Sequence, residues 1–169
     1  MRVVVGKWTQ AVAMAAVVFA VFAGTAGTPG AQATAGGQDP GPKKAAQPQP
    51  AGASVLTGAY TDEQAKRGEA ASNKLCTSCH GPDLSGGEAG PTLVGAEFVA
   101  TWTGLSAADF YDRVHATMPA DAPCTMTPQQ TSDVTAYVLK LNKYPAGQTE
   151  LPTDVAALKN IMIEGQPTK

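Results

Sequence analysis

Residues 74–82 read KLCTSCHGP, and this stretch decides how the rest of the 169-residue sequence is interpreted. Within it, Cys76, Cys79 and His80 form the pattern C-x-x-C-H, which is typical of covalent haem attachment. At the end of a helix, two thiols three residues apart can reach the two vinyl groups on one edge of a porphyrin. His80, next in the chain, is then held beneath the iron. The pattern therefore predicts thioether bonds from both cysteines and iron ligation by His80.

Two other uses of paired cysteines remain open from the residues alone. A thiol-redox C-x-x-C motif is expected among alternating strands and helices, and strand signals are nearly absent here. A zinc site would need a fourth ligand, which Cys124 or His115 could provide. The helical setting and the export signal described below favour the haem.

Helix signals dominate the sequence from about Val55 onward. Three segments begin with an N-cap residue followed three positions later by Gln or Asp, which is the arrangement of a capping box. They predict helices that begin at Thr61, Ser106 and Thr127 and end near Leu75, Thr117 and Leu141. We therefore predict an all-α domain with long loops. Such a domain has little apolar mass of its own, and a buried macrocycle would supply what is missing.

The chain divides into three predicted parts. Residues 1–33 have a basic start, a short apolar stretch and small residues up to Ala33, which is the layout of a secretory signal peptide. Cleavage is expected after Ala33, with a site near Ala26 as the fallback, and an uncleaved membrane anchor stays open. Residues 34–54, rich in Ala, Gly, Pro and Gln, predict a flexible linker. Residues 55–169 are predicted to form the folded domain.

Charge and cysteine content limit the classes of partner and of chemistry. Loss of residues 1–33 removes Arg2 and Lys7, so 12 basic residues become 10 against 14 acidic ones. No basic stripe suits nucleic acid. Three cysteines cannot all pair within one exported chain. If two of them become thioethers, Cys124 is the one left over.

The second axial ligand of the iron should come from a loop distant from His80 in sequence. The candidates are His115, Met118, Met126 and Met162. Met118 is preferred because it follows a predicted helix and precedes Pro119, which stiffens the loop, and because Met/His ligation is the usual pairing for such a haem. Met126 is the alternative, although it directly precedes a helix cap. His115 is expected on a helix surface, and Met162 in a C-terminal apolar cluster.

Further motifs follow the C-x-x-C-H pattern in a fixed order. They are Gly90-Pro91-Thr92-Leu93, Phe98, Trp102, Thr117-Met118-Pro119 and residues 133–142, with Gly68 ahead of them all. With them, residues from about Asp62 to Ile163 resemble a monohaem class I c-type cytochrome. More narrowly, they resemble the cytochromes c associated with bacterial quinoprotein alcohol dehydrogenases and similar periplasmic oxidases. The resemblance implies the cytochrome c fold, with helices wrapped around one covalently bound haem c.

The resemblance also implies roles for individual residues around the haem. Met118 would be the sixth ligand. The carbonyl of Pro91 would accept a hydrogen bond from the ring nitrogen of His80 that does not bind iron. Trp102 would either reach a haem propionate with its indole N–H or simply pack in the core.

Two more residues carry implications from the same resemblance. Gly68 would let the first helix cross the last one at close range, against Tyr137. Cys124 departs from the family, which commonly has glycine there. This departure raises the question of the loop's conformation and of an intermolecular disulfide.

The two axial ligands expected for the haem iron, His80 and Met118, predict the function. With both axial positions occupied, no substrate reaches the iron, so we expect a periplasmic single-electron carrier rather than an enzyme. The partners follow only from the resemblance. The resemblance implies a periplasmic dehydrogenase as electron donor and an oxidase or another cytochrome as electron acceptor. We expect the mature protein to be a monomer, with no stable membrane insertion after the signal peptide is cleaved. The alternative is a haem enzyme or sensor with an open or bis-His sixth position, for which His115 is the other histidine available.

Export and haem attachment can be checked on the mature chain. Mass spectrometry of the protein purified from the producing cell is expected to show an N-terminus at Thr34 and the mass of one added haem. An intact Met1 on the mature protein would instead support the membrane anchor.

Overall fold

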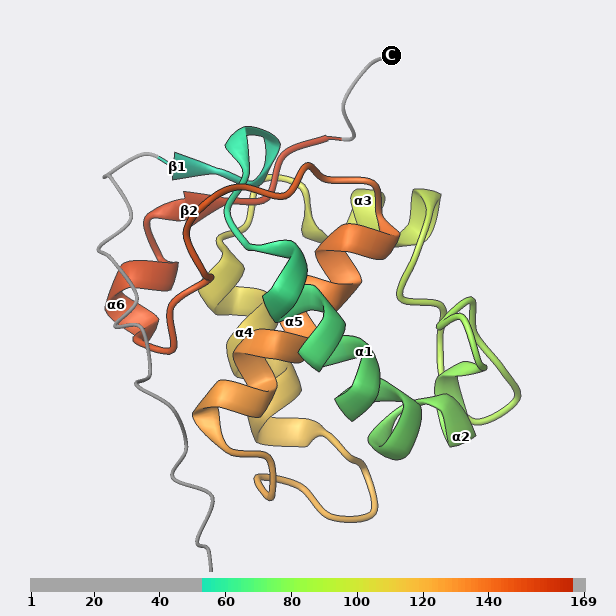
Figure 1. Cartoon of the computed structure of the whole chain (residues 1–169). Helices are drawn as coiled ribbons and strands as arrows, with labels where there is room; N and C mark the ends of the chain where they lie inside the picture. The colour runs from blue at the N-terminus through green and yellow to red at the C-terminus, as the bar shows by residue number, and fades with distance from the viewer. Residues whose placement is uncertain (1–52, 166–169) are drawn as a thin grey trace, which may run out of the picture. The chain divides into compact units, whose positions relative to one another are not determined.

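The computed structural model describes residues 53–165 (Figure 1). The predicted signal peptide and nearly all of the predicted linker lie outside these residues. The elements in chain order are β1 (Ala53–Ser54), a 3-10 turn (Val55–Thr57), α1 (Asp62–Leu75), α2 (Thr77–His80), α3 (Ala96–Trp102), α4 (Ala107–Thr117), α5 (Pro128–Leu141), α6 (Val155–Leu158) and β2 (Ile161–Met162). The described domain is built almost entirely of α-helices joined by long loops, as predicted.

The three predicted helices are α1, α4 and α5, and their capping residues act as expected with one exception. Ser106 and Thr127 take part in complete capping boxes at the starts of α4 and α5. At α1, Thr61 accepts a hydrogen bond from the backbone N–H of Gln64, but the Gln64 side chain does not return one to the cap. Its amide is buried instead and bonds to both backbone groups of Leu151. Gln64 thus makes tertiary hydrogen bonds in place of the capping hydrogen bond that the local sequence predicted.

The structure also has short elements that the sequence did not predict. Helices of four to seven residues such as α2, α3 and α6 contain too few turns for a periodic pattern. β1 pairs in parallel with β2, Ala53 facing Ile161. The folded part therefore begins at least two residues before Val55, where the sequence placed the boundary.

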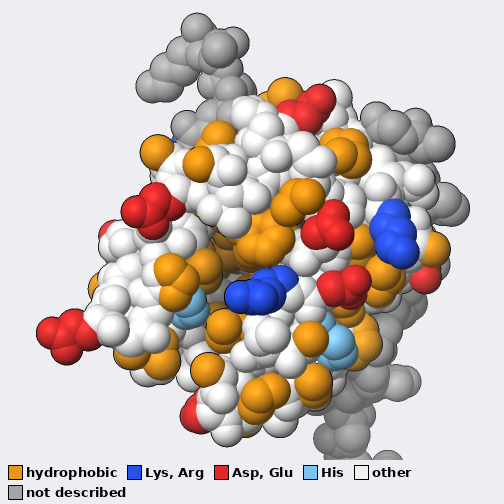
Figure 2. All heavy atoms as spheres, turned by 180° about the vertical axis from the view of Figure 1, so that it is seen from behind, with side chains coloured by type: hydrophobic (Ala, Val, Ile, Leu, Met, Phe, Trp, Pro, Cys, Tyr) orange, Lys and Arg blue, Asp and Glu red, His pale blue; other side chains and the backbone are white. Residues whose placement is uncertain are grey.

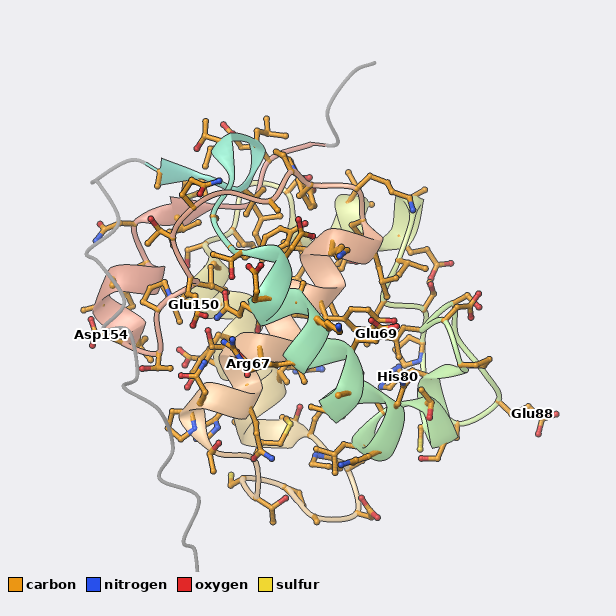
Figure 3. The ribbon with its side chains drawn as sticks, in the orientation of Figure 1. Arg67, Glu69, His80, Glu88, Glu150 and Asp154 are labelled. Carbon is orange, nitrogen blue, oxygen red and sulfur yellow. The ribbon has the colours of Figure 1, made fainter. Side chains whose placement is uncertain are left out.

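The crossing of α1 and α5 is the main helix contact of the domain (Figure 1). A Cβ atom at Gly68 would overlap the carbonyl of Asp133 and lie 2.8 Å from the Cβ of Tyr137. The absence of a side chain is thus what permits the approach, which confirms the predicted role of Gly68. Beside it, Arg67 bonds the carboxylates of Asp133 and Glu150, both at 2.9 Å. Figure 3 shows Arg67 and Glu150 directed toward each other.

The C-terminal apolar cluster differs from the prediction at one residue. Leu158, Ile161 and Ile163 are fully buried, whereas Met162 is 37% exposed. Successive side chains of a strand point to opposite sides, so β2 buries Ile161 and turns Met162 outward. Met162 is therefore not part of the cluster.

Among the described residues, no helix is both long and apolar enough to cross a bilayer.

Replacement of Gly68 by Ala is expected to destabilise the holoprotein by about 1–3 kcal/mol or more, because the new methyl group meets α5 backbone. Gly165→Ala is the control, since its Cβ would meet nothing within 4 Å. Chemical denaturation measures both free energies of unfolding. Equal stabilities for the two variants would contradict the role given to Gly68.

Candidate haem site

The cysteine motif lies on a single turn that continues from α1. The N–H of Cys76 donates to the carbonyl of Ser72 in α1, and the N–H of His80 donates to the carbonyl of Cys76. Cys76 is the N-cap of α2, Cys79 and His80 lie within α2, and all three residues line the same pocket. The motif thus has the geometry that its spacing predicted, with two thiols and one ring nitrogen on one wall.

His80 is held in one orientation by the loop that follows it, residues 81–95. The side chain is buried, 6% exposed, and its Nδ1 lies 2.7 Å from the carbonyl oxygen of Pro91. A carbonyl only accepts, so Nδ1 carries the proton and Nε2 is the nitrogen left free to bind a metal. Figure 3 shows His80 on the inner side of this loop and Glu88 at its outer tip. The hydrogen bond implied for Pro91 is present.

Gly90 forms the other contact with the ring of His80. A Cβ atom there would lie 2.9 Å from Nδ1 and 3.0 Å from Cε1. Because such distances are too short for carbon, only glycine lets the backbone lie flat against the imidazole. The loop therefore fixes the His80 ring by a hydrogen bond from Nδ1 to the Pro91 carbonyl and by close packing of the Gly90 backbone.

The pocket is a mainly apolar cavity of about 480 Å³, within the range of about 300–1,000 Å³ typical of ligand sites. Its walls come from α2 and the following loop on one side, and from α4, α5 and the loop between them on the other. Figure 2 shows apolar side chains gathered around a hollow in this face of the domain. Both Met118 and Met126 line the cavity. Met118 is half-buried and Met126 is 3% exposed.

The other candidate ligands and contacts lie away from the lining. His115 stacks on Tyr111, and its Nδ1 is 3.2 Å from the hydroxyl of Thr131 on α5. It is half-buried rather than on the open helix surface. Trp102 packs edge to face on Phe110, with ring centroids 4.8 Å apart. The lining includes Phe110 but neither His115, Trp102 nor Met162.

The zinc alternative finds no support in this part of the chain. Within residues 53–165, no three His, Cys, Asp or Glu side chains gather into a metal-binding group. Cys124 is exposed, and its sulfur approaches the carbonyl of Ala116, not the paired cysteines. The two thiols and His80 therefore share the pocket with apolar side chains and methionine sulfurs, and this set fits a haem.

The environment of Cys76 sets the state of its thiol before attachment. Burial raises the pKa of this thiol, and the neighbouring Cys79 adds to the rise. The hydroxyl of Ser72, buried on the same side of α1, acts in the opposite direction. The Cys76 thiol is thus held in its neutral form, in keeping with an apolar wall.

The comparison with known protein families agrees with this geometry. Residues 63–138 match the family described as "Cytochrome C oxidase, cbb3-type, subunit III". Among solved structures, the sulfane dehydrogenase SoxCD from Paracoccus pantotrophus is similar at 25% sequence identity and a TM-score of 0.44, over 61% of this chain and 53% of that chain. The chain thus spans about half the length of that neighbour. No curated protein matches it.

The matched segment contains the complete haem-attachment motif and most of the helices that enclose the pocket. It is a c-type cytochrome domain. Its cofactor is covalently bound haem c, and its chemistry is haem-based electron transfer. The class and cofactor predicted from C-x-x-C-H are confirmed, whereas the narrower likeness to dehydrogenase-associated cytochromes is not part of this match.

Cys124 has an unusual backbone conformation in the loop between α4 and α5. Its φ is +62°, in the left-handed region where glycine is favoured. The glycine that the family resemblance implied at this place would have a physical reason, because a Cβ is strained there. Cys124 therefore adopts a backbone conformation that glycine would adopt with less strain.

Cys124→Gly is expected to stabilise the reduced, monomeric holoprotein by about 0.5–1 kcal/mol, because relief of the left-handed strain exceeds the entropy cost of glycine. Cys124→Ala is the control, since it removes the thiol and keeps the strain. Thermal denaturation of the three proteins compares them. Equal stabilisation by Gly and Ala would assign the effect to the thiol rather than to the backbone.

Proposed function

We propose that the chain is a periplasmic single-electron carrier with one covalently bound haem c, ligated by His80 and Met118. One observation carries this proposal. His80, its Nδ1 fixed by the Pro91 carbonyl, shares a single apolar pocket with two methionines. With a sixth ligand drawn from the chain itself, the iron has no open position for a substrate.

The residues of the pocket suit reversible gain and loss of one electron. Haem c supplies the one-electron chemistry when it is bound. The Pro91 carbonyl raises the basicity of the His80 ring and fixes its plane. Apolar walls from α4 and α5 disfavour extra charge and so favour the ferrous state. Ligands that both belong to the chain, His80 and Met118, would stay on the iron in both oxidation states.

Met118 suits the sixth position better than Met126. Its backbone N–H donates to Val114 and ends α4, after which Pro119 restricts the chain, so its side chain is presented at the start of a stiff loop. Met126 directly precedes Thr127, the N-cap of α5, and is buried in the core. Met126 therefore has a packing role in its present place and is the fallback ligand.

The compartment and partners follow from sequence features that support the same proposal. The signal-peptide layout of residues 1–33 supports export, and covalent attachment keeps the haem where it is hard to replace. The resemblance to dehydrogenase-associated cytochromes supports a periplasmic dehydrogenase as donor and an oxidase or another cytochrome as acceptor. Docking is brief in such redox encounters, which suits a monomeric carrier.

Absorption spectra of two single variants test the ligand assignment. Met118→Ala is expected to abolish the weak red sulfur-to-iron charge-transfer band of the ferric protein and to lower the reduction potential, because the thioether stabilises ferrous iron. Met126→Ala is the matched control, since it removes a second methionine from the same pocket and should leave the band.

Loss of the band in Met126→Ala alone would make Met126 the ligand. A high-spin ferric spectrum of the wild-type protein would contradict the electron carrier and support a haem enzyme or sensor with an open sixth position.

A further inference from the structure

Asn142, the residue that ends α5, makes an unusual set of contacts for a helix terminus. Its side chain is 1% exposed. Oδ1 accepts a hydrogen bond from the N–H of Gly95 at 2.9 Å, and Nδ2 donates to the carbonyls of Leu93 at 3.0 Å and Val138 at 2.9 Å. A single buried amide thus joins the end of α5 to the loop 81–95.

The same loop fixes the orientation of His80, the proposed proximal ligand of the iron. Pro91, whose carbonyl bonds Nδ1 of His80, stands two residues before Leu93. The N–H of Leu93 is itself fixed by the carbonyl of Leu84 at 2.8 Å. Asn142 therefore holds the far end of a short segment whose near end sets the orientation of the imidazole.

Burial explains why this amide holds the loop firmly. An amide removed from water must find partners in the protein, and here it finds them in the backbone of the loop and of its own helix. Replacement by an apolar side chain would leave the Leu93 carbonyl and the Gly95 N–H without these partners. The segment from Pro91 to Gly95 would then be free to move away from α5.

We propose that Asn142 is a positioning residue for the proximal haem ligand and thereby tunes the reduction potential. It acts through the loop, by keeping the Pro91 carbonyl within hydrogen-bond distance of His80. The inference rests on the proposed ligation of the iron by His80. A stronger hydrogen bond to Nδ1 makes the imidazole a better donor and stabilises ferric iron. Loss of the anchor therefore raises the potential.

Two variants of Asn142 and one control separate positioning from general stability. Asn142→Ala and Asn142→Leu both remove the hydrogen bonds, and leucine keeps the volume of the side chain. Gln64→Leu is the matched control, because Gln64 is also a fully buried amide that joins a helix to a distant backbone segment. Its partners, Ser132 and Leu151, lie outside the loop 81–95.

The readouts are the reduction potential and the exchange rate of the His80 Nδ1 proton in the ferrous holoprotein, followed by nuclear magnetic resonance. Both Asn142 variants are expected to raise the ferrous-to-ferric ratio at fixed ambient potential by about threefold to tenfold. Tenfold corresponds to about 59 mV for one electron. The ring proton should exchange at least about tenfold faster. Gln64→Leu should lose stability and change neither readout.

Unchanged potential and exchange in both Asn142 variants, or equal changes in Gln64→Leu, would overturn the inference. The wild-type spectrum separates this failure from failure of the proposed function. Haem-shifted resonances of His80 in the wild-type protein establish it as a ligand whatever the variants do. Their absence would remove the proposed ligation itself.

Discussion

The close contact between α1 and α5 at Gly68 is the constraint on which the remaining structure depends. It brings backbone against backbone, so the two helices are fixed relative to each other without adjustable side chains between them. α1 carries the cysteine turn at its end, and α5 carries a wall of the pocket and Asn142 at its own end. One missing Cβ thus sets the geometry between the attached edge of the haem and the wall that faces it.

The parts of the fold that sequence predicts are those with local causes. The capping residues of α4 and α5 act within four positions of each other, and the spacing of Cys76, Cys79 and His80 encodes one helical turn. Gln64 shows where this reasoning fails. The same residue type that completes a cap at Gln130 is drawn into the core at Gln64, because Leu151 offers a buried backbone partner.

The site shows the same division between local and distant causes. The pairing of His80 with Pro91 follows from a motif read by resemblance, whereas the contact of Asn142 with Leu93 and Gly95 joins residues almost fifty positions apart and leaves no local pattern. Likewise, Met118 and Met126 both line the pocket. Sequence context ranks them as candidate iron ligands, but it does not predict that both lie in the same pocket.

The size of the pocket has a consequence for the stability of the protein. A mainly apolar cavity of about 480 Å³ leaves wall residues of α4 and α5 without packing partners until it is filled. A porphyrin bound there would supply those contacts in the folded chain alone, and so would stabilise it relative to the unfolded chain. The haem would thus complete the apolar core as well as carry the electron.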